Sequence, residues 1–326
     1  MKKIFLILLI IAVLFTSCKT DSEPYSKTDF YLGTVVTITI YDKNAEDMVN
    51  GSMAEIERLE GLLSANIEDS EITRINSSAG IAGVDVSDDT LAVIRKGLEY
   101  YDKSNGLFDI SIGTLVDLWG IGTEDARVPS QKEINDALDL IGIKNIEITG
   151  NNVMLLKKGM KIDVGGIAKG YIADKIAEYL RDNGCDAAVI NLGGNVLTVG
   201  RKPDGTKWRI GIQNPFESTG TYLRVVEVDE MSVVTSGSYE RFFVEDGITY
   251  HHILDPNTGY PVDSDISGVS IISNRSVDGD GLSTSVFALG YEKGMSLIEL
   301  ISGVECIIIL KDGDIEYSSG IAEYLD

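Results

Sequence analysis

Two glycine-marked segments of this 326-residue chain place polar side chains where a phosphate could bind. The first, residues 163–170, has paired glycines and Lys169 directly before a predicted helix. Paired glycines let the backbone approach a ligand closely, and a helix N-terminus beside a lysine favours phosphate. The spacing is not that of a P-loop. A tight strand-to-helix turn that binds nothing explains this segment equally well.

The second segment, residues 280–284, begins with Asp280 and ends with Thr284. Residues i and i+4 lie on one face of a helix, so the carboxylate and the hydroxyl can meet at one point. Hard oxygen ligands suit Mg²⁺, which takes few protein ligands and completes its shell with water and substrate phosphate. Taken alone, Asp280 is explained more simply as the N-cap of a helix.

His251 and His252 are the only histidines and stand side by side at the end of a predicted strand. Because side chains alternate along a strand, we expect at most one of them to face any given site. Histidine is the usual general base near neutral pH, and a structural histidine is the alternative for either residue. A further segment, residues 106–111, sets Phe108 beside Asp109. It could hold a flat heterocycle, but aromatic residues in such a setting are more often core.

The N-terminus has the pattern of a bacterial lipoprotein signal peptide. Two lysines precede an apolar run over residues 4–15, which is too short to span a bilayer, and small residues precede Cys18. An ordinary secretory signal is the alternative. We expect residues 1–17 to be removed, Cys18 to carry a lipid, residues 18–27 to form a tether and residues 28–326 to form the domain. The protein would then be exported and anchored to the cell membrane, on its periplasmic or outer-surface side.

Composition argues against several classes of function. A formal net charge of −23 repels nucleic acid and offers no polybasic patch to a membrane, so attachment would depend on the lipid. Cys185 and Cys306 lie in apolar stretches, and we expect both to be buried and unpaired. With no cysteine cluster and two histidines, zinc and iron–sulfur centres are not expected.

The periodicity of the chain predicts helices early and strands late. Without regular βαβ alternation, this order indicates an α+β fold, a single large domain of largely antiparallel β-sheets with packed helices. Predicted helices cover residues 45–63, 88–101, 171–183, 280–289 and 292–302, with a short one near 134–138. Predicted strands cover residues 31–41, 146–148, 153–156, 187–192, 208–212, 222–228, 242–245, 250–254, 269–273 and 306–310.

Taken together and in this order, these segments resemble the ApbE family of lipoprotein flavin transferases. The resemblance covers essentially all of the chain after the signal peptide. The pairing of residues 163–170 with residues 280–284 is its most diagnostic part. The matching segments are residues 32–34, 69–72, 106–109, 163–170, 192–195, 235–240, 252–261 and 280–284.

The resemblance implies a reaction with FAD as substrate. Family members break the FAD pyrophosphate with Mg²⁺ and attach the FMN part through a phosphoester to a Thr or Ser hydroxyl of a target protein, releasing AMP. It implies Asp280, Thr284 and the carbonyl of Gly166 as metal ligands, and His252 as the base that takes the acceptor proton. Residues implied to contact FAD are Leu32, Asn66, Leu107, Phe108, Asp109, Asp163, Lys169 and His251.

Elementary chemistry agrees with these roles. Pyrophosphate cleavage needs charge neutralised on the phosphate oxygens, which Mg²⁺ and Lys169 can supply. A hydroxyl nucleophile needs a base, because its own pKa is far too high.

Two positions depart from the family pattern. Many relatives have methionine at the position of Leu32, and the family commonly has an aromatic residue at the position of Asn66. An aromatic ring can stack on the flavin dinucleotide, whereas asparagine cannot. Some relatives with asparagine also hydrolyse FAD to FMN and AMP, so we hypothesise that water can replace the protein hydroxyl here.

The sequence leaves two alternatives to FMN transfer. One is an FAD pyrophosphatase that gives free FMN and AMP, and the other is a non-catalytic FAD-binding lipoprotein. The acceptors that the resemblance implies are exported or membrane-associated electron-transfer proteins with FMN-binding domains. Examples are subunits of sodium-pumping or ferredoxin-linked oxidoreductases.

Overall fold

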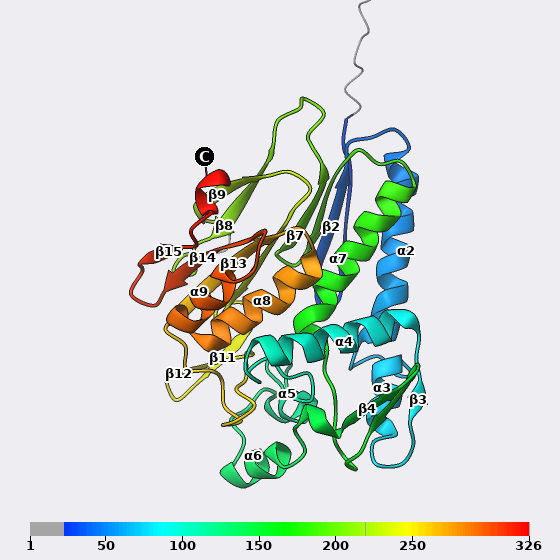
Figure 1. Ribbon diagram of the computed structural model, residues 1–326, viewed down its shortest axis with the longest axis vertical. Coiled ribbons are helices and arrows are strands. Elements are labelled where there is room, and N and C mark those ends of the chain that lie inside the picture. Colours follow the sequence, from blue (N-terminus) through cyan, green and yellow to red (C-terminus); the bar gives the residue numbers. More distant parts are fainter. Residues whose placement is uncertain (1–22, 219, 326) are drawn as a thin grey trace, which may run out of the picture.

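The computed structural model describes residues 23–218 and 220–325, so the predicted signal peptide and Cys18 lie outside the described residues. At its centre is an eight-stranded antiparallel sheet with the strand order β1-β2-β6-β7-β10-β13-β14-β15 (Figure 1). Among the described residues, no helix is long and apolar enough to cross a membrane. The strands of this sheet are β1 (Tyr25–Tyr31), β2 (Thr34–Ile40), β6 (Ala187–Leu192), β7 (Asn195–Gly200), β10 (Ser232–Gly237), β13 (Ile266–Ser273), β14 (Val304–Leu310) and β15 (Ile315–Tyr317).

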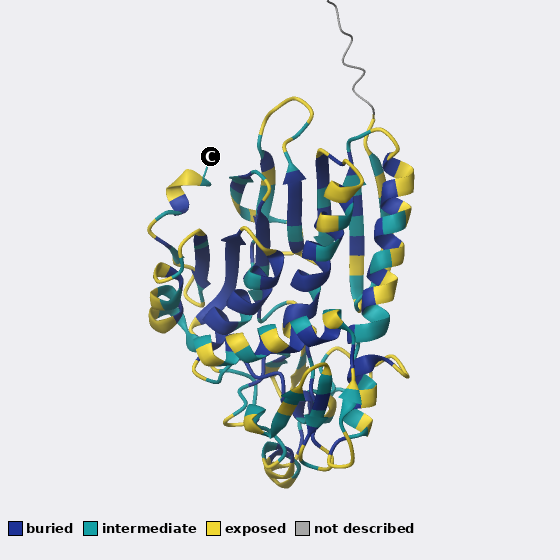
Figure 2. Cartoon of the chain, turned by 45° about the vertical axis from the view of Figure 1, so that its right-hand side comes forward, coloured by how far each residue is buried: buried dark blue, intermediate teal, exposed yellow. Residues whose placement is uncertain are grey.

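Four helices cover one face of this sheet and enclose the main core with it (Figure 1). Alternate residues of β2, among them Val36 and Ile38, point into this core and are fully buried. The opposite side of α2 stays exposed, whereas α8 is buried nearly all round (Figure 2). The four helices are α2 (Ala45–Leu63), α7 (Gly165–Asp182), α8 (Ser276–Leu289) and α9 (Tyr291–Glu299).

The other face of the sheet carries a second, smaller core. A two-stranded hairpin, β8 (Trp208–Gln213) and β9 (Tyr222–Val228), packs its apolar side there. Trp208 of the hairpin and Ile272 and Ile307 of the sheet belong to this cluster and are buried.

A group of short elements lies beyond the end of the sheet where β1 turns into β2 (Figure 1). A third apolar cluster, around Trp119, joins part of this group to the hairpin formed by residues 242–251 and to residues 254–260. The indole of Trp119 also donates to the carbonyl of Gly259 at 2.8 Å. The elements are α3 (Glu71–Ser77), β3 (Val84–Asp85), α4 (Asp88–Lys103), α5 (Gly113–Trp119), α6 (Gln131–Leu138), β4 (Ile146–Thr149), β5 (Asn152–Leu155), β11 (Phe242–Glu245) and β12 (Ile248–His251), with short 3₁₀ turns at Ile143–Asn145 and Ile321–Glu323.

The α+β class and the antiparallel sheet are confirmed, while several boundaries differ from the predicted ones. The expected strand over residues 31–41 begins only at Thr34. Leu32 and Gly33 adopt φ of 57° and 65° and form the two-residue turn of the hairpin that joins β1 to β2. β1 begins at Tyr25, so residues 25–27, the last three of the predicted tether, pair with β2 as part of the sheet. α7 begins at Gly165 rather than at residue 171, and the paired glycines form its first turn.

α7 and α8 cross in close contact, and the N-terminus of α8 is capped from α7. Asp174 accepts hydrogen bonds from the amides of Ser276 at 2.7 Å and Val277 at 3.2 Å. The residue that precedes α8, Arg275, provides no side-chain cap itself. The predicted alternative that Asp280 caps this helix is therefore wrong, since α8 begins four residues earlier.

We predict that Gly170→Ala destabilises the fold. A Cβ at Gly170 would lie 2.3 Å from the carbonyl oxygen of Ser276, a backbone atom that cannot rotate away. Overpacking of this kind costs about 1–3 kcal/mol of unfolding free energy, measurable by urea denaturation. Gly61→Ala in α2 is the control: open space surrounds that position, so stability should be unchanged or rise by up to about 1 kcal/mol. Equal stability of the two variants would contradict this account of the helix crossing.

Asp174 should make stability depend on pH. Burial raises the pKa of its carboxyl to about 6, although the two amide hydrogen bonds oppose the rise. Between pH 4 and 6 the unfolded chain loses this proton while the folded chain keeps it, so rising pH lowers stability, by on the order of 2–3 kcal/mol. The amide side chain of Asp174→Asn does not titrate in this pH range, so the stability of this variant lacks that part of the dependence on pH.

Urea denaturation between pH 4.5 and 7 should therefore show the stability of Asp174→Asn gaining on the wild type as pH rises. Asp136→Asn, at an exposed position of α6, is the control and should follow the wild type at every pH. A pH-independent difference between Asp174→Asn and the wild type would contradict the raised pKa.

Candidate active site

The first turns of α7 meet α8 at Asp280. The amide of Gly170 donates to Oδ2 of Asp280 at 2.8 Å, and Nζ of Lys169 lies 3.9 Å from Oδ1. Asp280 is only 3% exposed, and burial raises the pKa of its carboxyl while Lys169 and the Gly170 amide oppose the rise. A buried carboxylate whose ammonium partner is this distant is short of positive charge, so its position favours a cation.

Two further predicted metal ligands lie on the two helices that cross here. Thr284 follows Asp280 by one turn of α8 and is half-buried. In a regular helix the amide of Gly170 points at the carbonyl of Gly166. Because that amide reaches Asp280, the Gly166 carbonyl and the Asp280 carboxylate lie around one N–H group.

The paired glycines form an exposed first turn of α7. Val164 precedes the helix without a side-chain cap, and Oδ1 of Asp163 accepts the amide of Gly165 at 2.7 Å. Phe108 packs over Gly166, where a Cβ would lie 3.2 Å from the ring. Burial raises the pKa of the Asp163 carboxyl. The amides of Ile167 and Ala168 donate to the carbonyl of Val164, at 3.0 and 2.9 Å, so the exposed Gly166 is the residue of this turn where an anion can approach the backbone.

Residues 107–109 lie beside this turn. The amide of Asp163 donates to the carbonyl of Ile110 at 2.8 Å, which aligns the two segments. Phe108 is buried, which agrees with the alternative that this aromatic residue belongs to the hydrophobic core. Leu107 is half-buried. Oδ1 of Asp109 accepts the amide and hydroxyl of Ser111, at 2.7 and 2.6 Å, and burial raises the pKa of its carboxyl.

His252 carries a ring whose tautomer follows from its neighbour. Its Nδ1 lies 3.3 Å from the carbonyl oxygen of Arg241, and since that oxygen can only accept, Nδ1 bears the proton. Nε2 is then the basic nitrogen. Burial, together with the charges of Lys169 and Arg241, lowers the pKa of His252 to about 3. The ring is therefore neutral at physiological pH.

His251 points to a different environment, as strand alternation predicted. Its Nε2 donates to the carbonyl of Val262 at 3.1 Å, and its Nδ1 accepts the amide of Ile253 at 3.3 Å. The buried ring meets Phe287 edge-on. Both nitrogens are thus used within the fold, and only the backbone of His251 is left to contact a nucleotide.

Leu32 and Asn66 lie at the rim of this region. Leu32 holds its left-handed conformation with its amide bonded to Oε1 of Glu60 at 2.7 Å. Asn66 is exposed in the loop after α2. Its neighbour Ala65 lines a cavity of about 260 Å³ that Asp163 also lines.

Sequence reasoning missed Glu240 and Arg241. Glu240 is an exposed residue, yet loss of water around its carboxyl raises the pKa of that group to about 7. Lys169 and Arg241 oppose the rise, and Asp280 adds to it. Both residues follow β10, and residues 235–240 were already among the segments that resemble the family. Only their position at the end of a strand beside the helix crossing gives them a role.

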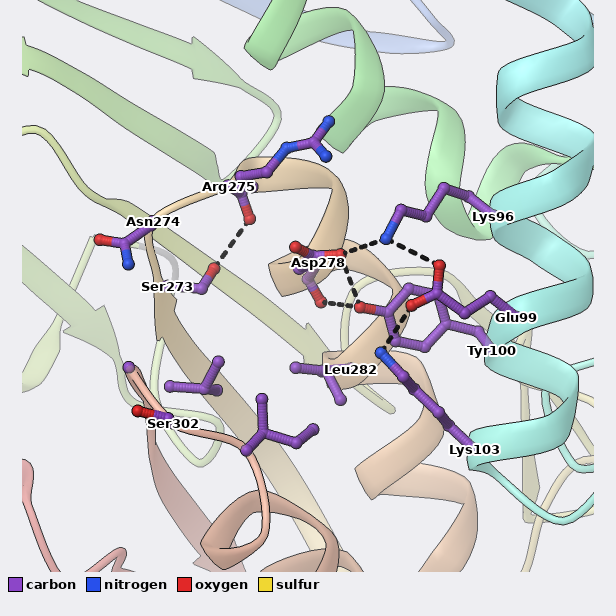
Figure 3. A pocket seen from close by; sticks show the side chains of 13 residues that line it. Lys96, Glu99, Tyr100, Lys103, Ser273, Asn274, Arg275, Asp278, Leu282 and Ser302 are labelled. Atoms are coloured by element: carbon purple, nitrogen blue, oxygen red, sulfur yellow. Dashed lines mark hydrogen bonds and ion pairs between the residues drawn. The ribbon is translucent and has the colours of Figure 1, made fainter.

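A second cavity, of about 160 Å³, lies on another side of α8 (Figure 3). Its charged groups are all paired. The Tyr100 hydroxyl and Nζ of Lys96 both reach Oδ1 of Asp278 at 2.9 Å, and Lys96 also pairs with Glu99. Lys103 pairs with Glu99 at 2.7 Å, and Arg275 lies 3.5 Å from Asp174 of α7. A Cβ at Gly281 would lie 2.5 Å from the Tyr100 ring. These contacts hold α4 against the start of α8 and leave no free charge for a ligand.

No cluster of three or more His, Cys, Asp or Glu side chains suited to a metal occurs among the described residues. Cys185 and Cys306 are buried and unpaired, as expected. A metal at the helix crossing would therefore have one carboxylate ligand and otherwise neutral oxygens.

Known proteins resemble this chain along most of its length. The sequence profile of the ApbE family matches residues 32–308. The chain is 36% identical to the FAD:protein FMN transferase of Treponema pallidum over 318 residues, 92% of this chain and 88% of that protein. It is also 36% identical to the FAD:protein FMN transferase of Klebsiella pneumoniae over 302 residues, which covers 92% and 93% of the two chains.

Solved structures agree with the sequence matches. The ApbE protein of Thermotoga maritima superposes with a TM-score of 0.86 at 32% identity, over 93% of this chain and 100% of that one. The flavin transferase ApbE of Vibrio cholerae gives 0.84 at 27% identity, over 93% and 99%. From the family profile, the sequence identity and the shared fold, we conclude that this chain belongs to the ApbE family.

Proposed function

We propose that this protein transfers the FMN part of FAD to a Thr or Ser hydroxyl of a target protein, releasing AMP, with Mg²⁺ as cofactor. The observation that carries the proposal is the helix crossing. There a buried Asp280, Lys169 and the exposed first turn of α7 come together, and the charge of Lys169 acts on a neutral His252. The relatives named FAD:protein FMN transferase support the same reaction.

The residues at the crossing fit Mg²⁺. Asp280 supplies a buried carboxylate, Thr284 a hydroxyl and Gly166 a carbonyl, all hard oxygens. Few protein ligands leave coordination positions for water and phosphate oxygens. Bound there, the cation would neutralise negative charge on the FAD pyrophosphate.

The side chains around it divide the remaining tasks. Lys169 and the exposed backbone at Gly166 in the first turn of α7 bind and orient phosphate oxygens. Nε2 of His252 accepts the proton of the acceptor hydroxyl, whose oxygen then bonds to the FMN phosphorus. The low pKa of His252 results first from burial and then from the charges of Lys169 and Arg241. A bound pyrophosphate offsets those two charges, which raises the pKa and makes His252 a stronger base.

Water competes with the protein hydroxyl in this scheme. Asn66 is exposed at the rim, where it offers no ring to stack on the flavin. FAD hydrolysis to FMN and AMP is therefore the second candidate activity. Non-catalytic FAD binding is less well supported, because a storage site needs neither a base nor a metal ligand.

We also propose that the protein works outside the cytoplasm, anchored through Cys18, on exported or membrane-associated electron-transfer proteins with FMN-binding domains. Subunits of sodium-pumping or ferredoxin-linked oxidoreductases are such acceptors. The signal-peptide pattern of residues 1–18 supports this location. The tether keeps enzyme and acceptor in the same compartment.

Asp280→Ala tests the proposed function. With a small FMN-binding domain, FAD and Mg²⁺, mass spectrometry should show the acceptor gaining one FMN on a threonine. The variant should lose at least about 100-fold in rate, because the metal loses its carboxylate. Its affinity for FAD, measured without Mg²⁺, should stay within about tenfold. Asp136→Ala, at an exposed position, should behave as the wild type.

The same assay separates the alternatives. Release of AMP in the absence of an acceptor protein indicates hydrolysis of FAD. If no AMP is released under these conditions, hydrolysis is ruled out. FAD binding with neither AMP nor labelled acceptor would leave only a binding protein.

His252→Ala should lower FMN transfer by about 100- to 10,000-fold while FAD binding persists, because the variant lacks only the base. Imidazole in the buffer should restore part of the rate. His251→Gln should instead lower the melting temperature, since two buried hydrogen bonds are disturbed. Full transfer by His252→Ala would remove His252 from the mechanism.

A further inference from the structure

Arg241 stands directly before β11, and its side chain reaches back to the turn between β1 and β2. Its Nη2 donates to the carbonyl of Gly33 at 3.3 Å. A Cβ at Gly33 would lie 3.5 Å from Nη2, and a Cβ at Gly122 would lie 3.5 Å from Cδ. The side chain is thus held between two left-handed glycines that leave room for it.

The charge of Arg241 has no ion-pair partner. Arg58, Arg127 and Arg201 each have a carboxylate oxygen nearby, at 2.6, 2.7 and 2.8 Å. Within residues 23–218 and 220–325, no carboxylate oxygen lies within 4.0 Å of the Arg241 guanidinium. Five N–H groups are available on a guanidinium, so most remain for a ligand.

Arg241 and Lys169 both lie close enough to His252 and Glu240 for their charges to act on these two groups. Both lower the pKa of His252, and both oppose the rise in the pKa of Glu240. Lys169 also acts on Asp280, next to the metal ligands, whereas Arg241 acts on Asp163, beside the first turn of α7. The backbone ties Arg241 to His252 directly, since the carbonyl of Arg241 accepts the amide of His252 at 3.1 Å and lies 3.3 Å from its Nδ1.

We propose that Arg241 is a phosphate-binding residue that contacts the pyrophosphate of FAD, in addition to Lys169. This inference rests on the proposed function. A guanidinium can hold two phosphate oxygens at once, and a pyrophosphate offers two phosphoryl groups to two cations. In a chain with 51 acidic and 28 basic side chains, an unpaired arginine beside the site supplies charge that the substrate lacks elsewhere.

Arg241 forms and breaks no covalent bond in this scheme. The acceptor oxygen bonds to the FMN phosphorus, its proton passes to His252, and the electron pair of the broken phosphorus–oxygen bond goes to the AMP phosphate. The guanidinium stabilises charge on the pyrophosphate as this happens. The backbone carbonyl of Arg241 separately holds Nδ1 of His252, and substitution of the side chain leaves that carbonyl in place.

Arg241→Gln and Arg241→Lys test this role through binding. Fluorescence titration with FAD, and with riboflavin as a probe without phosphate, is done on the full chain in EDTA. Arg241→Gln should weaken FAD binding by about tenfold or more and change riboflavin binding by less than about twofold, with Arg241→Lys in between. Arg95→Gln, at an exposed position of α4, is the matched control and should bind both as the wild type does.

Each other outcome overturns the inference in a distinct way. Equal weakening of FAD and riboflavin binding, with a lower melting temperature, would assign Arg241 to holding the β1–β2 turn. Unchanged FAD binding with reduced labelling of the acceptor alone would assign it to the acceptor protein. A wild-type chain that binds no FAD would overturn the proposed function itself, whatever the variants do.

Discussion

The site depends on how closely α7 and α8 approach each other, and Gly170 makes that approach possible. With no Cβ, its amide reaches Oδ2 of Asp280 at 2.8 Å, where any side chain would meet the backbone of Ser276. In return, Asp174 of α7 caps the N-terminus of α8. Each helix therefore supplies hydrogen-bonding partners to the other. This mutual contact fixes the depth of Asp280 in the protein, and hence its need for a cation.

Electrostatic balance is the second constraint on the site. The carboxyl groups of Asp163, Glu240 and Asp280 all have raised pKa values, and His252 has a lowered one, each mainly through burial. Groups perturbed in this way gather at functional sites because desolvation makes charges interact strongly there. On a chain of net charge −23, the local cations make an anionic substrate acceptable.

Local patterns predicted much of the fold. Helix α2 spans the predicted residues 45–63, and the alternation of His251 and His252 correctly indicated two environments. The start of α7 was not predictable, because glycine costs about 1 kcal/mol in a helix and paired glycines indicate a turn. Contacts with a distant part of the chain stabilise that first turn: Phe108 packs over Gly166, and the amide of Asp163 donates to the carbonyl of Ile110. No short window of sequence contains this information. For the same reason, nothing local identified Arg241, whose contact Gly33 is far away in the chain.

The sequence by itself determined which groups are available and which of them share a local face. Asp280 and Thr284 fall one helical turn apart, and the N-terminal pattern predicts an exported lipoprotein, because both are properties of short contiguous stretches. Only the tertiary structure decided which groups meet. It buried Asp280 beneath Gly170, fixed the tautomer of His252 on the carbonyl of Arg241, and left the guanidinium of Arg241 without an ion-pair partner among the described residues. Burial and long-range contact set those properties, since a charge changes its behaviour with the surroundings that the whole fold provides.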